Sequence, residues 1–167
     1  MDEPFVIEPG DSTGVNLGGL GVHFKIGGHR TGGSFAVVEH PIEPGRLVMP
    51  HTHDDVDEYS YVIEGVVGAR IGDHEVEAGA GAYIVKPRGV MHTFWNPGSR
   101  PARLLEILSP AKFELYFAEL AERLGQEMSP EERARVRDEM ASRHRIRFDG
   151  TWVEDLKRRH HLRLLGE

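Results

Sequence analysis

The sequence predicts a mainly β fold followed by a helical extension, and two observations support this prediction. Up to Pro110, glycine and proline recur at short intervals between β-rich runs such as "SFAVVEH", "EYSYVIEG" and "HTFWN". Short strands separated by such turn signals are typical of an antiparallel sandwich or barrel. After Pro110, the apolar residues recur at the spacing of an amphipathic helix.

The chain length favours a single domain, because 167 residues bury a sizeable core but are too few for two full-sized domains. We expect residues 1–109 to form the β unit, including strands at its N-terminal end, with a motif-bearing core at 45–96. Residues 110–167 are expected to form the helical extension, packed on the β unit or on a partner subunit.

Three helices are expected in the extension. Ser109 and Pro110 have the form of an N-cap and a first-turn proline, and Ser129 to Glu132 have the form of a capping box. A third helix is expected after Thr151. The simplest interpretation of these helices is a structural cover, because amphipathic stripes usually pack against a core. The residues that suggest the first helix and its end are Phe113, Tyr116, Phe117, Leu120, Leu124 and Gly125, and those that suggest the third are Trp152, Glu154 and Leu156.

Composition excludes several classes of protein. No stretch is long enough to span a membrane, and the acidic start "MDEPFVIEPG" lacks the basic and apolar regions of a signal peptide. We therefore expect a cytoplasmic protein with no membrane partner. Cysteine is absent, so any metal must be held by histidine and carboxylate side chains.

The charge distribution argues against nucleic-acid binding. Residues 1–109 hold 8 Lys+Arg against 15 Asp+Glu, and residues 110–167 hold 12 against 12. Neither part has the net positive charge that general binding to nucleic acid requires, so DNA and RNA are not expected partners.

The run "HTHDDVDEYSYVIEG" contains the strongest functional signal. Side chains alternate faces along a strand, so His51 and His53 point to the same side and can bind one ion together. Straight alternation would put Glu58 on the opposite face, so a bend at "DDVD" must turn it inward again. Most of the acidic run is then an exposed turn.

The spacing of these residues resembles that of the cupin superfamily. Five residues separate Gly45 from His51, one separates the histidines, four precede Glu58, and six precede Gly65. A second string follows fifteen residues later, also with the spacing of the family. On these two strings, the chain resembles a single-domain metallo-cupin. The members of that second string are Gly81, Pro87, Gly89, His92 and Asn96.

The resemblance implies a small conical, jelly-roll-like β-barrel with one divalent metal ion inside, held by His51, His53, Glu58 and His92. Three neutral imidazoles and one carboxylate leave a net charge of about +1 and, for an octahedral metal, about two open positions. Iron(II) is the favoured metal, while manganese, nickel, cobalt, copper and zinc also accept these ligands.

Strand alternation also predicts the lining of a substrate pocket. The expected inward-facing residues are Leu47, Met49, Ser60, Val62 and Phe94, which form a largely apolar cavity with the metal at one side. For Met49 and Phe94, an ordinary place in the barrel core is an equally good interpretation.

The sequence is also similar to small cupins grouped with quercetin dioxygenases, on the run "TGGSFAVVEHPI" and the helix "AKFELYFAELAERL". This implies a dioxygenase or related oxidative enzyme that chelates a small aromatic or enolic, flavonol-like substrate and uses O₂, with Glu58 as candidate general base. Two alternatives remain open. One is a non-oxidative isomerase, cyclase, decarboxylase or lyase, and the other is a non-catalytic binding module.

Aromatic side chains at outward positions suggest a covered surface. Alternation points Tyr59, Tyr61, Tyr83 and Trp95 away from the barrel interior, where the helices or a second subunit can cover them. A symmetric homodimer is therefore expected.

Overall fold

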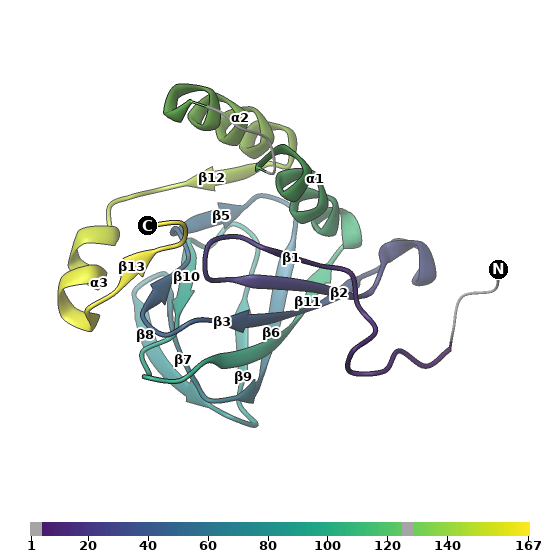
Figure 1. Ribbon diagram of the computed structural model, residues 1–167, viewed down its shortest axis with the longest axis horizontal. Coiled ribbons are helices and arrows are strands. Elements are labelled where there is room, and N and C mark those ends of the chain that lie inside the picture. The colour runs from purple at the N-terminus through teal and green to yellow at the C-terminus, as the bar shows by residue number, and fades with distance from the viewer. Residues whose placement is uncertain (1–4, 125–128) are drawn as a thin grey trace.

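The computed structural model describes residues 5–124 and 129–167. Two β-sheets face each other, and helices lie at one end and one side of them (Figure 1). The first sheet is antiparallel and has the order β1 (Gly14–Asn16), β2 (Gly21–Ile26), β3 (Ala36–Ile42), β11 (Ala102–Ser109), β6 (Asp57–Glu64) and β9 (Tyr83–Lys86).

The second sheet contains strands from both the β unit and the extension. Its main path has the order β12 (Ile146–Phe148), β5 (His51–His53), β10 (His92–Trp95), β4 (Arg46–Leu47) and β13 (Arg163–Leu164). Strand β7 (Val66–Ile71) pairs with β10 and with β8 (His74–Gly79). The predicted mainly β architecture with C-terminal helices is therefore confirmed.

The core between the sheets follows from strict alternation along the strands. In β11 every second side chain is buried, so Leu104 and Leu108 point inward, while their sequence neighbours are partly exposed. The same alternation points Val62 of β6 inward and leaves Tyr59 with an exposed fraction of 40%. Tyr83 on the neighbouring strand β9 is 76% exposed.

The first predicted helix begins later than its sequence signal suggests. Ser109 still belongs to β11, where it pairs with Asp57, so the N-cap predicted at Ser109 is wrong. A 3₁₀ turn (Ala111–Phe113) follows Pro110, and α1 then spans Glu114–Leu124. The predicted stop at Gly125 lies outside the described residues.

The second helix has the predicted cap, and the third does not. α2 (Pro130–Arg143) begins with the capping box, in which Ser129 Oγ accepts a hydrogen bond from the Glu132 backbone NH at 3.2 Å. α3 (Val153–His160) has Trp152 as its N-cap. The Thr151 backbone NH instead donates to Asp149 Oδ1 at 2.8 Å, which closes a turn just before the helix.

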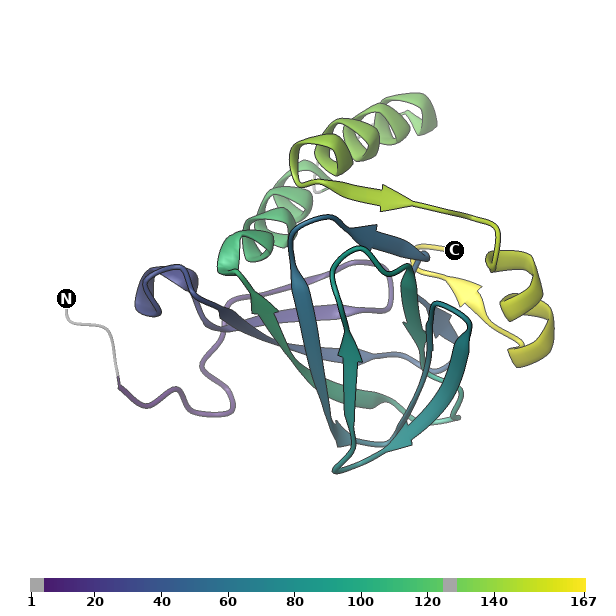
Figure 2. The same ribbon diagram turned by 180° about the vertical axis from the view of Figure 1, so that it is seen from behind.

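The extension adds two strands to the sheet, which helix patterns did not indicate. Residues of β12 pair with β5, and α1 and α2 lie beyond this end of the sandwich (Figures 1 and 2). Two carboxylates of the acidic turn bind the same segment, because Asp54 accepts from Arg147 at 3.0 Å and Asp55 accepts from Arg145 at 3.1 Å. The acidic run is thus a turn held by ion pairs.

Trp95 points outward from β10 as predicted and is nevertheless fully buried. Leu156 of α3, with Leu47 and Leu162, packs in one apolar cluster with the indole ring. The third helix therefore covers this face of the second sheet. Among the described residues, no helix is long and apolar enough to cross a membrane.

Candidate metal centre

The four predicted ligands lie together between the two sheets. Strand β5 carries His51 and His53, the neighbouring β10 carries His92, and β6 of the opposite sheet carries Glu58. Each offers one ligand atom, and these atoms lie within 4.8 Å of one another in fully or almost fully buried positions. The bend after His53 has turned Glu58 inward, as the spacing required.

The distances and unpartnered nitrogens of this cluster fit a bound ion. His53 Nε2 lies 3.1 Å from Glu58 Oε1, and His92 Nε2 lies 3.2 Å from Glu58 Oε2. Neither nitrogen has a hydrogen-bond partner of suitable geometry, although both are buried. Ligand atoms about 2.1 Å from one ion and at right angles to each other lie about 3 Å apart, so an ion among these atoms would satisfy them all.

Backbone carbonyls orient two of the imidazole rings. His51 Nδ1 lies 2.7 Å from the carbonyl oxygen of Met49, and His92 Nδ1 lies 2.9 Å from that of Val90. A carbonyl can only accept, so each Nδ1 donates and each Nε2 keeps its lone pair for a cation. Such supporting hydrogen bonds fix the tautomer and orientation of metal-binding histidines.

The protonation states also suit a cation. Burial holds the pKa of His51 well below 6.5, and the neighbouring His92 and His53 lower it further. Burial would raise the pKa of Glu58, but the opposing charges of Lys86 and His53 outweigh it and hold the pKa well below 4.5. Metal ligands must be deprotonated, and these two groups are so at neutral pH.

A buried ion-pair network adjoins the cluster and was missed by sequence reasoning. Lys86 Nζ lies 2.9 Å from Glu58 Oε2 and 2.6 Å from Glu106 Oε1. The two carboxylates outweigh the effect of burial and raise the pKa of Lys86, which therefore stays charged. Single charged residues within the apolar runs "YIVK" and "LLEIL" were the available signal, since charges are almost never fully buried unless paired.

The four clustered side chains adjoin a cavity of about 850 Å³, and two of them, His51 and Glu58, lie on its wall. This volume lies within the range of about 300–1,000 Å³ that is usual for small-molecule sites. Much of the remaining lining is aromatic and comes from the extension as well as from the barrel. The aromatic lining residues are Phe94, Phe113, Tyr116, Phe117 and Phe148.

Of the five predicted pocket residues, two line the cavity and three lie elsewhere. Met49 and Phe94 line the cavity. Leu47 lies in the Trp95 cluster on the outer side of the second sheet, because three residues that belong to no strand separate β4 from β5 and interrupt the alternation. Ser60 donates to Glu106 at 2.8 Å, and Val62 packs in the core between the sheets.

The helices of the extension contribute to the cavity as well as covering the barrel. Phe113 packs edge-on against His53 with ring centres 4.2 Å apart, and it stacks on Tyr116 at 5.1 Å. Both side chains also line the cavity. The first helix and the turn before it therefore form one wall of the candidate site.

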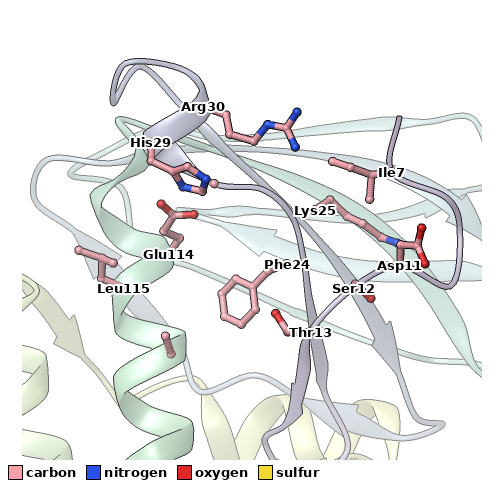
Figure 3. A pocket seen from close by; sticks show the side chains of 12 residues that line it. Ile7, Asp11, Ser12, Thr13, Phe24, Lys25, His29, Arg30, Glu114 and Leu115 are labelled. Carbon is pink, nitrogen blue, oxygen red and sulfur yellow. The ribbon is translucent and has the colours of Figure 1, made fainter. Parts of the chain in front are cut away.

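A second hollow, of about 760 Å³, lies between the N-terminal segment, β2 and α1 (Figure 3). Two of its polar side chains already hold the chain together. Lys25 Nζ donates to the Pro9 carbonyl oxygen at 3.1 Å, and Glu114 Oε1 accepts from the Gly28 backbone NH at 2.7 Å. The cavity beside the four clustered side chains is therefore the candidate site.

Residues 38–108 match the family model of the cupin domain. This segment contains all four clustered side chains, so the part of the chain that matches the cupin model also contains the group that could hold a metal ion. The chain is also 35% identical over 69 residues to the "Tetracenomycin polyketide synthase protein TcmJ" of Streptomyces glaucescens. That alignment covers 41% of this chain and 46% of the relative, so it spans less than half of either protein.

Solved structures of low sequence identity share the fold. KdgF from Halomonas sp. is 15% identical, with a TM-score of 0.59 over 68% of this chain and 99% of its own. An oxalate decarboxylase of Lactobacillus farciminis, in a formate complex, is 19% identical, with a TM-score of 0.58 over 66% of this chain and 35% of its own. These similarities establish the cupin fold and leave the reaction open.

Proposed function

We propose that the protein is a metal-dependent cupin enzyme that oxidises a small aromatic or enolic, flavonol-like substrate. The observation that carries the proposal is the position of the metal cluster, which opens through His51 and Glu58 into an aromatic-lined cavity of about 850 Å³. A flat apolar substrate with one chelating oxygen suits such a site. Iron(II) is the metal we favour, because three histidines and one carboxylate accept it.

When bound, a divalent ion there would supply a Lewis acid for one substrate oxygen and, if redox-active, electrons for O₂. The chain itself supplies orientation and proton acceptance. Glu58 lies on the cavity wall, and in this proposal it accepts the proton of an enol or phenol hydroxyl. Phe94 and Phe113 add apolar rings to the wall of the same space.

The curated relative supports this substrate class. It is named as a polyketide synthase protein, and polyketide chains carry enolisable carbonyl groups and cyclise to hydroxylated aromatics. A non-oxidative reaction on the same kind of substrate, such as isomerisation or cyclisation, is the second candidate. It is favoured by further proton-accepting side chains on the cavity wall, His40 and Glu106.

Oxygen consumption distinguishes the two candidates. The purified protein, loaded in turn with iron, manganese, nickel, cobalt, copper and zinc, would be assayed with flavonols and other enolic aromatics. Substrate-dependent O₂ uptake that is lost in Glu58→Gln supports the oxidative proposal. Conversion of the substrate without O₂ uptake supports the non-oxidative candidate, and no conversion with any metal contradicts both.

A further inference from the structure

Two buried polar side chains on the cavity wall lie outside the cluster of four candidate ligands. His40 on β3 and Glu106 on β11 are 1% and 2% exposed, and both line the cavity that contains Glu58. Phe94 and Phe117 lie beside them, with ring centres 6.3 and 5.5 Å from the imidazole of His40. The pair is therefore a polar spot on an otherwise largely apolar wall.

The hydrogen bond of His40 determines what its other nitrogen can do. His40 Nδ1 lies 2.8 Å from the carbonyl oxygen of Gly21, so Nδ1 carries the hydrogen. Burial lowers the pKa of His40 below 6.5 despite the opposing charge of Glu106, so the ring is neutral at pH 7. Nε2 is then a hydrogen-bond acceptor.

The contacts of Glu106 leave one of its oxygens facing that acceptor. Oε1 accepts from Ser60 Oγ at 2.8 Å and pairs with Lys86 Nζ at 2.6 Å. Oε2 lies 3.8 Å from His40 Nε2, beyond hydrogen-bond distance. Two acceptors thus lie side by side, and a hydroxyl beside them can donate its hydrogen to one or the other.

We propose that His40 Nε2 and Glu106 Oε2 form a subsite for a hydroxyl group of the substrate, separate from the oxygen that binds the metal. This inference rests on the proposed function and specifies its substrate class. The ligand is a hydroxylated aromatic, which places one oxygen at the metal-binding side chains and a second hydroxyl beside the two acceptors, where it donates to one of them. A buried acceptor left without a donor disfavours analogues that lack this hydroxyl.

The test compares the binding of matched ligands and needs no turnover. Anaerobic titrations of the metal-loaded protein would measure the affinity for 3-hydroxyflavone and for analogues that carry one additional hydroxyl group. At least one analogue should bind about five- to tenfold more tightly, as expected for one added hydrogen bond. In His40→Phe this preference should fall below about twofold.

A histidine outside the cavity provides the matched control. His74 is exposed on β8, and His74→Phe should keep the wild-type preference. A wild-type protein that binds 3-hydroxyflavone but shows no preference among the analogues overturns the subsite and leaves the proposed function standing, whether or not His40→Phe folds. An undiminished preference in folded His40→Phe also overturns it. Failure of the metal-loaded protein to bind any flavonol overturns the proposed function and the subsite together.

Discussion

Lys86 occupies an unusual position for a lysine, because it is almost fully buried between two carboxylates. Its ammonium group lies within 3 Å of both Glu58 and Glu106. Each of the three charges is tolerable only while the others are present, since an unpaired buried charge is costly. The network therefore joins the candidate metal ligand Glu58 to the polar wall of the cavity.

The metal-free Lys86→Met variant should be destabilised by about 3–5 kcal/mol, because two buried carboxylates lose their shared cation. Urea unfolding of the metal-free wild type and variant measures this difference. Lys157→Met is the control, since that lysine pairs with Glu167 at a partly exposed site and its loss should cost about 1 kcal/mol or less. A cost for Lys86→Met as small as the control's would show that the buried pairing does not stabilise the fold.

The orientation of the motif side chains could be predicted because it depends on local geometry. Alternation over three residues and one turn places His51, His53 and Glu58 without knowledge of the sheet. The network of Lys86 and Glu106 depends on which strands become neighbours, since β6 lies between β9 and β11 only in the folded sheet. No short segment of the sequence indicates which strands become neighbours, so this network could not be predicted.

At the scale of elements, interruptions of regular structure explain where prediction failed. Leu47 was expected to continue the inward face of His51, but the regular strand is interrupted between β4 and β5 and the alternation restarts. The first helix begins after β11 has completed its pairing through Ser109, which delays it beyond the cap-like Ser-Pro pair. Both differences arise because tertiary pairing overrides a local signal.

Helix α3 should be an integral part of the fold, because Leu156 is fully buried against Trp95 and Leu47. We expect Leu156→Ala to reduce the free energy of unfolding by about 2–5 kcal/mol. Leu115→Ala is the matched control, since that side chain is 60% exposed and its truncation should change stability by about 0.5 kcal/mol or less. Equal effects of the two substitutions in urea unfolding would contradict the packing described for α3.

At the scale of the whole molecule, the extension and the barrel line one cavity. The barrel supplies the four clustered candidate ligands, and the extension supplies cavity walls through Phe113, Tyr116 and Phe148. Sequence patterns predicted the helices, but they favoured the interpretation that the helices only cover the barrel. The contribution of Phe148 to the cavity depends on β12 pairing with β5, a contact between distant segments.

Stability of the metal-free protein should fall as the pH drops below about 6.5. Burial holds the pKa of His40 and of His51 below that value in the folded state. Unfolded chains therefore bind more protons than folded ones in this window, and each histidine contributes a loss of up to about 1.4 kcal/mol per pH unit. Urea unfolding between about pH 7 and 5 measures the slope, which should be shallower in His40→Phe than in wild type. An unchanged slope in the variant would contradict a buried neutral His40.

The most direct test of the account is elemental analysis of the purified protein, with two variants alongside. We expect close to one divalent transition-metal ion per chain in the wild type, after reconstitution if necessary, and in His74→Ala, whose side chain is exposed. His53→Ala should hold less than about a tenth of that amount, because it removes one of the four converging ligands. Absence of metal from the reconstituted wild type, or full occupancy in His53→Ala, would contradict the assignment of these four residues as a metal centre.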